Sequence, residues 1–140
     1  MALRPILATI ALFAAVPAMA EVSKGAAVSI ELNAAKTVDG ACTLSFLVQN
    51  GHDVQIDQAI YETVLFDVSG QVDRLTLFDL GSLPPGRPRV RQFSVAAVTC
   101  EGIGSILING AQTCSGVGLP EGACERGLIL SSRTDIEVMG

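Results

Sequence analysis

The sequence predicts an all-β fold, an immunoglobulin-like antiparallel β-sandwich of about seven strands. Two β-rich runs, Ile60–Phe66 and Gln71–Leu80, flank the tight turn Asp67–Gly70. A second turn, Leu83–Gly86, contains two prolines and leads into a third run that begins near Arg89. No helical apolar period of useful length follows the N-terminal segment. Strands that alternate with short turns are typical of an antiparallel sandwich.

The N-terminal segment, residues 1–20, has the pattern of a secretory signal peptide. One positive charge, Arg4, precedes an apolar run from Pro5 to Val16, and Ala18-Met19-Ala20 supplies a small-x-small cleavage site. The alternative is an uncleaved membrane anchor, but the run is shorter than the roughly 20 apolar residues that a spanning helix needs. We therefore expect cleavage before Glu21 and one mature β-sandwich domain over residues 21–140.

The composition limits the possible partners. Without Arg4, the nine basic residues of the chain fall to eight, against fourteen acidic residues, so the mature domain is acidic. An acidic domain does not favour nucleic acid or anionic lipid as a partner. The chain has no tryptophan and one tyrosine, so aromatic stacking platforms for sugars or single strands are poorly supplied.

Four cysteines follow the signal segment: Cys42, Cys100, Cys114 and Cys124. An even count in an exported chain indicates two disulfides, although four cysteines allow three pairings. We favour Cys42–Cys100, which would join the ends of two antiparallel strands, and Cys114–Cys124, which would staple the glycine-rich loop Ser115–Ala123. The alternative is a metal or redox site, but the chain has no C-x-x-C motif and one histidine. No metal or cofactor is expected.

The first strands follow from alternation. Val28–Leu32 alternates apolar and polar residues and is expected to form a first strand at a sheet edge. Asp39-Gly40 marks a turn, and Cys42–Gln49 then gives the clearest half-buried pattern of the chain. After the turn Asn50–Asp53, the run Ile56–Phe66 is apolar on both faces at its C-terminal end. Its expected hairpin partner is Gln71–Leu80.

The second half of the chain predicts three more strands. Val90–Val98 is expected to be a strand with a bulge, because its apolar pattern shifts between Val90 and Phe93. Ile103–Ile108 is a short apolar run that ends at an Asn-Gly pair. Leu128–Val138 is expected to close the domain as the last strand.

Part of this pattern resembles small extracytoplasmic bacterial sandwiches of the FxLYD type. The shared features are the strand end Val48-Gln49-Asn50-Gly51, the segment Val64-Leu65-Phe66-Asp67 with Gly70, the turn Leu83-Pro84-Pro85-Gly86, and a strand that contains Phe93. The resemblance covers about residues 42–98, and neither the four cysteines nor the last run belongs to the pattern. It implies an accessory or interaction module and provides no catalytic residue.

A basic strand is the most informative candidate site. Arg87, Arg89 and Arg91 recur at every second position, so in an extended chain they project from one face. With Arg74 they hold half of the mature basic charge, which suggests binding to a carboxylate- or phosphate-bearing partner. The alternative is a solvated edge strand whose arginines pair across the sheet with acidic residues, namely Asp73, Asp79 or Glu62.

Three other features of the sequence are candidate sites. His52 lies in a turn without a legible catalytic partner and is expected to be a solvated surface residue. The turn from Asp67 to Asp73 offers oxygens that could bind calcium, although turn geometry alone explains them. The loop Ser115–Ala123 could be presented for recognition, or could simply be stapled.

Together these features favour an exported, non-enzymatic module that acts in protein–protein interaction or as an envelope accessory protein, in the periplasm or outside the cell. A hydrolase is disfavoured because no G-x-S-x-G elbow occurs. The alternative is a periplasmic protein that binds a small ligand or calcium.

Overall fold

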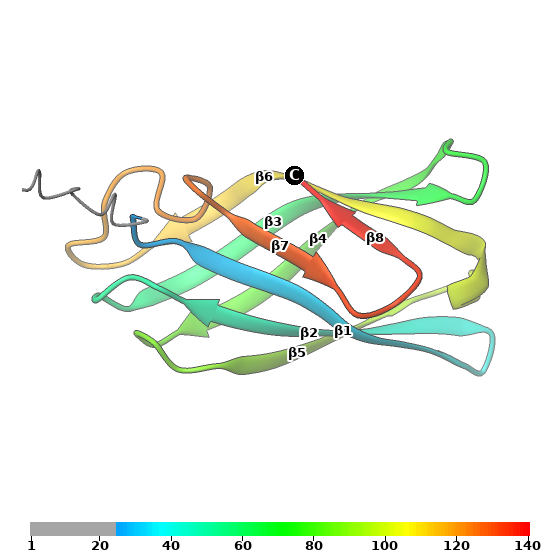
Figure 1. Ribbon diagram of the computed structural model, residues 1–140, viewed down its shortest axis with the longest axis horizontal. Coiled ribbons are helices and arrows are strands. Elements are labelled where there is room, and N and C mark those ends of the chain that lie inside the picture. The colour runs from blue at the N-terminus through cyan, green and yellow to red at the C-terminus, as the bar shows by residue number, and fades with distance from the viewer. Residues whose placement is uncertain (1–24) are drawn as a thin grey trace, which may run out of the picture.

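The computed structural model describes residues 25–140, so the predicted signal peptide lies outside the described residues. Within this range the chain forms eight strands and one short 3-10 helix, η1 (Cys100–Gly102) (Figure 1). The strands are β1 (Val28–Val38), β2 (Ala41–Asn50), β3 (Ile56–Asp67), β4 (Val72–Leu83), β5 (Arg89–Val95), β6 (Ile103–Ser115), β7 (Ile129–Ser132) and β8 (Glu137–Met139). None of the helices in residues 25–140 is long and apolar enough to cross a membrane.

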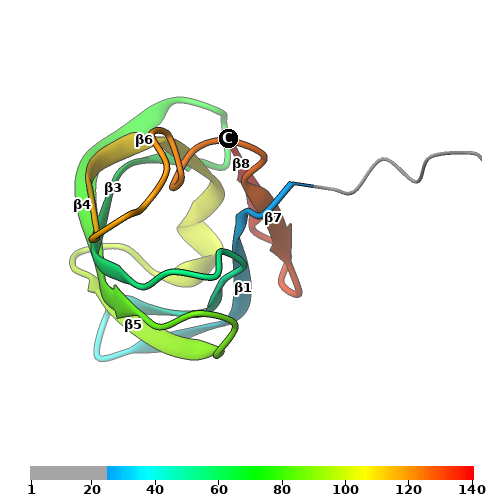
Figure 2. The ribbon, with the colours of Figure 1, turned by 90° about the vertical axis from the view of Figure 1, so that its left-hand side faces the viewer.

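The strands make two four-stranded sheets that face each other, which confirms the predicted sandwich. Sheet 1 has the order β5-β2-β1-β7, and sheet 2 has the order β4-β3-β6-β8. Seen from one end, the two sheets enclose the core, with β4 and β5 on one side and β7 and β8 on the other (Figure 2). Neighbouring strands are antiparallel, except that β7 runs parallel to β1 and β8 runs parallel to β6.

The core is filled by the inward residues of both sheets. In β2 the inward positions are Cys42, Leu44, Phe46 and Val48, all almost completely buried, as their alternation predicts. Phe46 packs against Phe78 of β4 and Phe93 of β5, with ring centroids 5.7 and 6.1 Å away. The contact with Phe78 joins the two sheets, and Phe78 also stacks on Phe93, with ring centroids 4.3 Å apart, where β4 and β5 meet.

Both disulfides have the connectivity that the sequence favours. Cys42 at the start of β2 is bonded to Cys100 in η1, and Cys114 near the end of β6 is bonded to Cys124. The first bond fixes the chain between β5 and β6 to sheet 1. The second closes the loop that follows β6, so that the loop lies against one end of the sandwich (Figure 1).

The sequence predictions for the first and the last strand are wrong. The first strand is not a short edge strand: β1 extends to Val38 and lies between β2 and β7. Its second half, Ala34–Val38, pairs with Ala41–Ser45 after a register shift, and it shows no apolar alternation because that end of the hairpin is largely exposed. The last run, Leu128–Val138, is also not one strand, because a turn stabilised by Ser132 and Thr134 side chains carries the chain from sheet 1 to sheet 2.

The predicted bulge between Val90 and Phe93 is absent. The register between β2 and β5 is continuous from Cys42 opposite Val95 to Val48 opposite Arg89. The apolar pattern is interrupted because arginines occupy inward positions. Arg89 and Arg91 alternate in phase with Phe93 and Val95, on the side of β5 that faces sheet 2.

Candidate functional site

Arg91 spans the gap between the two sheets. Its Nε donates to the carbonyl oxygen of Leu80 at 2.6 Å, and its Nη2 donates to that of Ser82 at 3.0 Å. Both carbonyls belong to β4, the edge strand of the opposite sheet. The fork of the guanidinium group thus occupies backbone acceptors that an edge strand would otherwise present to another chain.

Arg74 makes the reverse connection. It projects from β4, and its Nη1 donates to the carbonyl oxygen of Ala96, just after β5, at 2.6 Å. It also pairs with Asp73. The other two acidic residues considered as arginine partners have different contacts, because Asp79 accepts from the N–H of Gly81 and Glu62 accepts from the side chain of Asn109.

The four arginines therefore do not act as one stripe. Arg74 and Arg91 bridge the sheets, and Arg89 donates to the carbonyl of its neighbour Pro88. Arg87 is exposed in the loop between β4 and β5. A role of these arginines in binding a partner stays a prediction, and Arg87 and Arg89 are the two whose guanidinium groups do not cross between the sheets.

His52 is not a solvated turn residue as predicted: it is 8% exposed. Its Nε2 bonds the carbonyl oxygen of Ala123 at 2.8 Å, and its backbone N–H donates to the side chain of Asn50. Asn50 is itself buried and donates to the carbonyl oxygens of Val54 and Leu83. This network turns the imidazole inward, where it ties the β2–β3 turn to the stapled loop.

Tyr61 holds the next residue of the same loop. Its hydroxyl donates to the carbonyl oxygen of Cys124 at 2.7 Å, and the ring is almost completely buried. Burial raises the pKa of the Tyr61 phenol far above its usual value, with a smaller contribution from the negative charge of Glu125. His52 and Tyr61 thus bind two consecutive carbonyls, so the base of the stapled loop is fixed, while Val117 near its tip is 92% exposed.

The turn considered for calcium is closed by its own hydrogen bonds. Oδ1 of Asp67 accepts from the N–H and the hydroxyl of Ser69 and from the N–H of Gln71. These bonds lower the pKa of Asp67, Ser69 contributing most. Within residues 25–140 no three or more His, Cys, Asp or Glu side chains are grouped to hold a metal ion. Calcium binding stays an untested alternative.

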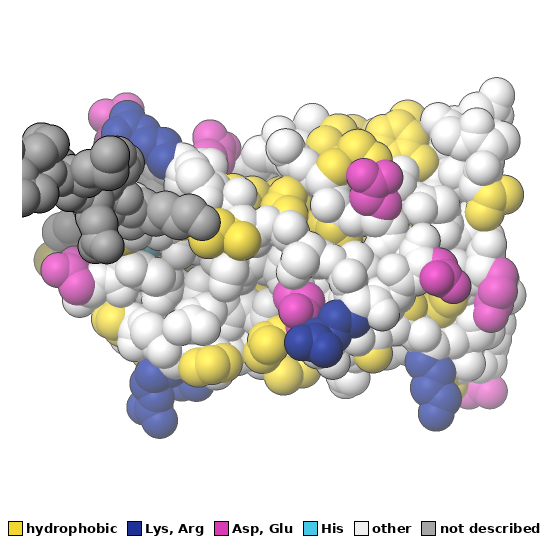
Figure 3. Space-filling view, in the orientation of Figure 1, with side chains coloured by type: hydrophobic (Ala, Val, Ile, Leu, Met, Phe, Trp, Pro, Cys, Tyr) yellow, Lys and Arg dark blue, Asp and Glu magenta, His cyan; other side chains and the backbone are white. Residues whose placement is uncertain are grey.

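The outer face of sheet 2 carries a feature to which sequence reasoning gave no role. Leu75 of β4 lies beside Val64 of β3, Val64 beside Leu107 of β6, and Leu107 beside Met139 of β8. These four residues form an apolar row across all four strands. Leu75 is 62% exposed, and Leu77, its neighbour on the same face of β4, is 47% exposed. Figure 3 shows part of this region, where apolar side chains gather over β6 and above β8.

The surroundings of the apolar row are acidic. The four strands of sheet 2 contain one basic residue, Arg74. Their acidic residues are Asp57, Glu62, Asp67, Asp73, Asp79 and Glu137. The outer face of sheet 1 differs, since its inner strand β2 presents Thr43, Ser45 and Gln49 outward together with the apolar Ala41 and Leu47. Alternation in β4 already places Leu75 and Leu77 together, but only the cross-strand register shows that the row continues over β3, β6 and β8.

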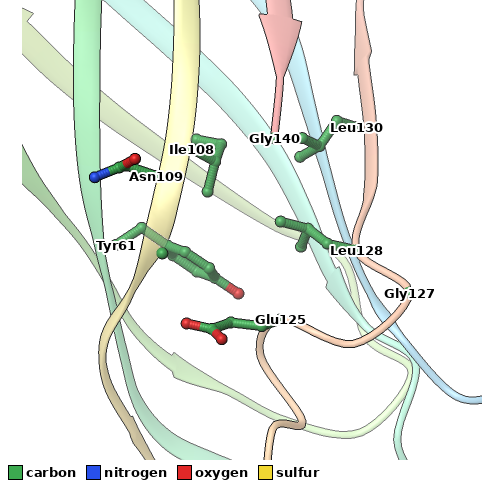
Figure 4. A pocket seen from close by; sticks show the side chains of 9 residues that line it. Tyr61, Ile108, Asn109, Glu125, Gly127, Leu128, Leu130 and Gly140 are labelled. Atoms are coloured by element: carbon green, nitrogen blue, oxygen red, sulfur yellow. The ribbon is translucent and has the colours of Figure 1, made fainter.

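A pocket of about 380 Å³ lies between β6 and the chain that follows the stapled loop. Tyr61, Ile108, Leu128 and Leu130 supply apolar surface, Glu125 points its carboxylate toward Tyr61, and the Asn109 side chain points away from the pocket, toward Glu62 (Figure 4). Glu125 also contacts the β6 backbone, because its Oε1 accepts from the N–H of Ala111 at 2.7 Å. The arrangement offers hydrogen-bonding groups beside an apolar wall but no nucleophile next to a base.

The fold is similar to that of IrmA from Escherichia coli. The two structures align with a TM-score of 0.57 over 77% of this chain and 92% of that chain, with 17% sequence identity. At this level of identity the likeness concerns the fold alone. No protein-family model matches the chain, and no curated protein sequence matches it significantly. The resemblance to FxLYD sandwiches therefore stays a prediction.

Proposed function

We propose that this protein is an extracytoplasmic, non-enzymatic interaction module that binds a partner protein through the outer face of sheet 2. The observation that carries the proposal is the apolar row Leu75–Val64–Leu107–Met139, which crosses the whole sheet: Leu75 is open to solvent, Leu107 and Met139 are half-buried, and Val64 between them is 7% exposed. Contiguous apolar surface with a polar rim is typical of protein-binding sites. Two disulfides support an oxidising compartment, in agreement with the predicted signal peptide.

The charge around the row defines the partner. Glu62, Asp79 and Glu137 lie on the same face as the row, and the only basic residue on the four strands, Arg74, reaches toward sheet 1. A second copy stacked face to face would place like charges opposite one another, which is unfavourable. The favoured partner is therefore a different protein, with an apolar binding surface surrounded by lysine and arginine side chains.

A photo-cross-linking amino acid placed at Leu75 or Leu77 tests this surface in the native host. Val90 is the matched control, because it lies on the outer face of sheet 1 and is 61% exposed, against 62% for Leu75. We expect one and the same basic protein to be cross-linked from both positions in β4 and not from Val90. Absence of a cross-linked partner, or equal cross-linking from Val90, would refute the proposal.

Purified components give the quantitative test. The double variant Leu75→Ser/Leu77→Ser should weaken binding of the identified partner by at least about tenfold, because a buried leucine side chain contributes about 1.5–3 kcal/mol. Val90→Ser should leave the affinity unchanged. Both variants alter exposed positions, so each should unfold at nearly the urea concentration of the unchanged protein.

A further inference from the structure

The second half of β6 has an open edge. β6 contains 13 residues and β8 contains three, so pairing between them covers only Ser105–Leu107. From Ile108 to Ser115, β6 pairs with β3 on one side, and on the other side residues 25–140 supply no strand. An edge of this kind offers backbone N–H and C=O groups to an added strand.

A groove follows this open edge. The pocket shown in Figure 4, of about 380 Å³, shares Asn109 and Gly110 with a second hollow of about 160 Å³. The second hollow shares Ala111 with a third, of about 520 Å³, which extends to Cys114. The three hollows therefore lie beside β6 between Ile108 and Cys114: the first and third adjoin the open edge, whereas the second, which Glu62 of β3 also lines, lies on the outer face of sheet 2. Seven residues of regular strand correspond to about 23 Å, and this stretch of β6 is somewhat shorter because its register against β3 shifts at Asn109 and at Gln112.

Glu125 occupies the position that a peptide carbonyl would take. Its Oε1 accepts from the N–H of Ala111 at 2.7 Å, and this N–H lies on the edge that no strand covers. Glu125 directly follows Cys124, which closes the stapled loop and whose carbonyl accepts from the Tyr61 hydroxyl. Because Glu125 is exposed, its oxygen can leave Ala111 when another acceptor arrives.

The charged and apolar residues that line the groove indicate which side chains an added strand would carry. Glu62, Glu121 and Glu125 line it, against a single basic residue, Arg126. The pocket wall opposite β6 is apolar, with Leu128 and Leu130. An extended segment presents alternate side chains to opposite sides. Basic residues at every second position would meet the carboxylates, and apolar residues between them would enter the pocket.

We propose that β6 accepts an added β-strand along Ile108–Cys114, and that the strand is an extended segment of the partner with alternating basic and apolar residues. This inference rests on the proposed function, since it takes the ligand to be a protein, and it names the mode of binding. The carbonyl of the added strand replaces the Glu125 oxygen at the N–H of Ala111, and the released carboxylate becomes available to a lysine or arginine of the partner.

The test uses fluorescently labelled synthetic peptides of about seven residues, long enough to cover the groove. One peptide alternates lysine and valine, a second replaces each lysine by glutamate, and a third repeats the first with its edge-facing amides N-methylated. Fluorescence anisotropy with the oxidised mature domain should show that the first peptide binds at least about tenfold more tightly than either of the others. N-methylation keeps the charges and removes the donors that a strand needs.

Two variants identify the site. Ala111→Pro removes the N–H at the open edge, and Glu125→Lys reverses the charge beside it, so each should weaken binding of the lysine–valine peptide by at least about tenfold. Val90→Ser on sheet 1 should bind unchanged. Circular dichroism checks that each variant is folded, and if Ala111→Pro is not, the N-methylated peptide on the unchanged protein decides the same question.

Each outcome separates the two proposals. Equal binding of the N-methylated peptide, or no binding of the lysine–valine peptide, would overturn strand addition and leave the apolar row to the cross-linking test. If the lysine–valine peptide binds as expected but no partner is cross-linked from Leu75, strand addition is supported. The outer face of sheet 2 is then refuted as the contact surface. If the protein instead forms a dimer, and Ala111→Pro abolishes it, the added strand comes from a second copy of this chain. That result would overturn the proposal of a basic partner.

Discussion

Removal of the Arg91 guanidinium should loosen the junction of β4 and β5. In the variant Arg91→Ala, the carbonyls of Leu80 and Ser82 lose charge-assisted hydrogen bonds of 2.6 and 3.0 Å. A hydrogen bond to a charged group contributes about 1.5–3 kcal/mol when water is excluded. Here the first bond is half-buried and the second is exposed, so water replaces part of both. We expect the free energy of unfolding to fall by about 1–2 kcal/mol.

Urea unfolding followed by circular dichroism measures this loss, and Arg89→Ala is the matched control. Arg89 lies two residues away on the same side of β5, but its guanidinium contacts only the carbonyl of Pro88. Its removal should change the free energy of unfolding by less than about 0.5 kcal/mol. Equal effects of the two variants would refute the bridging role of Arg91. Arg91→Lys should recover only part of the lost free energy of unfolding. Its ammonium group can bond one of the two carbonyls, but it lacks the fork that reaches both.

Three further predictions concern the stapled loop and the β3–β4 turn. Tyr61→Phe should cost about 1 kcal/mol in urea unfolding, by loss of the bond to the Cys124 carbonyl. Burial raises the pKa of Tyr61 in the folded state, so above about pH 10 the phenol ionises more readily in the unfolded chain. The free energy of unfolding should therefore fall above about pH 10 in the unchanged protein, and fall less in this variant. Cys114→Ala/Cys124→Ala, which opens a staple of sequence separation 10, should cost about 3 kcal/mol, and a loss below about 1 kcal/mol would contradict this. Because the pKa of Asp67 is lowered, Asp67→Asn should be less stable than the unchanged protein at neutral pH, and the difference in thermal unfolding should vanish as the pH falls below about 4.

Local alternation, turn residues such as Asn, Gly and Pro, and the even number of cysteines predicted the sandwich, most of its turns and the favoured cysteine pairing, but not the turn between β7 and β8. The β2 strand, for example, was recognisable because Cys42, Leu44, Phe46 and Val48 recur with period two. The inward face of β5 was harder to predict from the sequence, because Arg89 and Arg91 take inward positions there. An arginine can occupy such a position when its head group reaches backbone acceptors across a gap, and no sequence period reports that the gap exists.

The candidate sites depended on contacts between distant segments, which sequence patterns do not contain. His52 is a turn residue by its neighbours, yet its partner is Ala123, 71 positions later. The apolar row requires the register of four strands, including β8, which the sequence does not separate from β7. The open edge of β6 follows from the lengths of two strands, and these lengths are set by turns whose side-chain bonds were not predictable.

The structure of the other sheet edges supports the proposal that a partner strand binds along β6. β7 and β8 are edge strands of only four and three residues, which limits pairing with another chain. At the other side, Arg91 occupies carbonyls of β4, and Arg89 and Arg91 point inward from β5. Short strands and inward charges are devices that prevent edge-to-edge association. Over the second half of β6 neither device is present in the described chain, and one exposed carboxylate, Glu125, covers the N–H of Ala111. The domain thus protects its outer edges by construction, whereas β6 between Ile108 and the Cys114–Cys124 disulfide has no paired strand on one side within residues 25–140, and there the Glu125 carboxylate accepts from the N–H of Ala111.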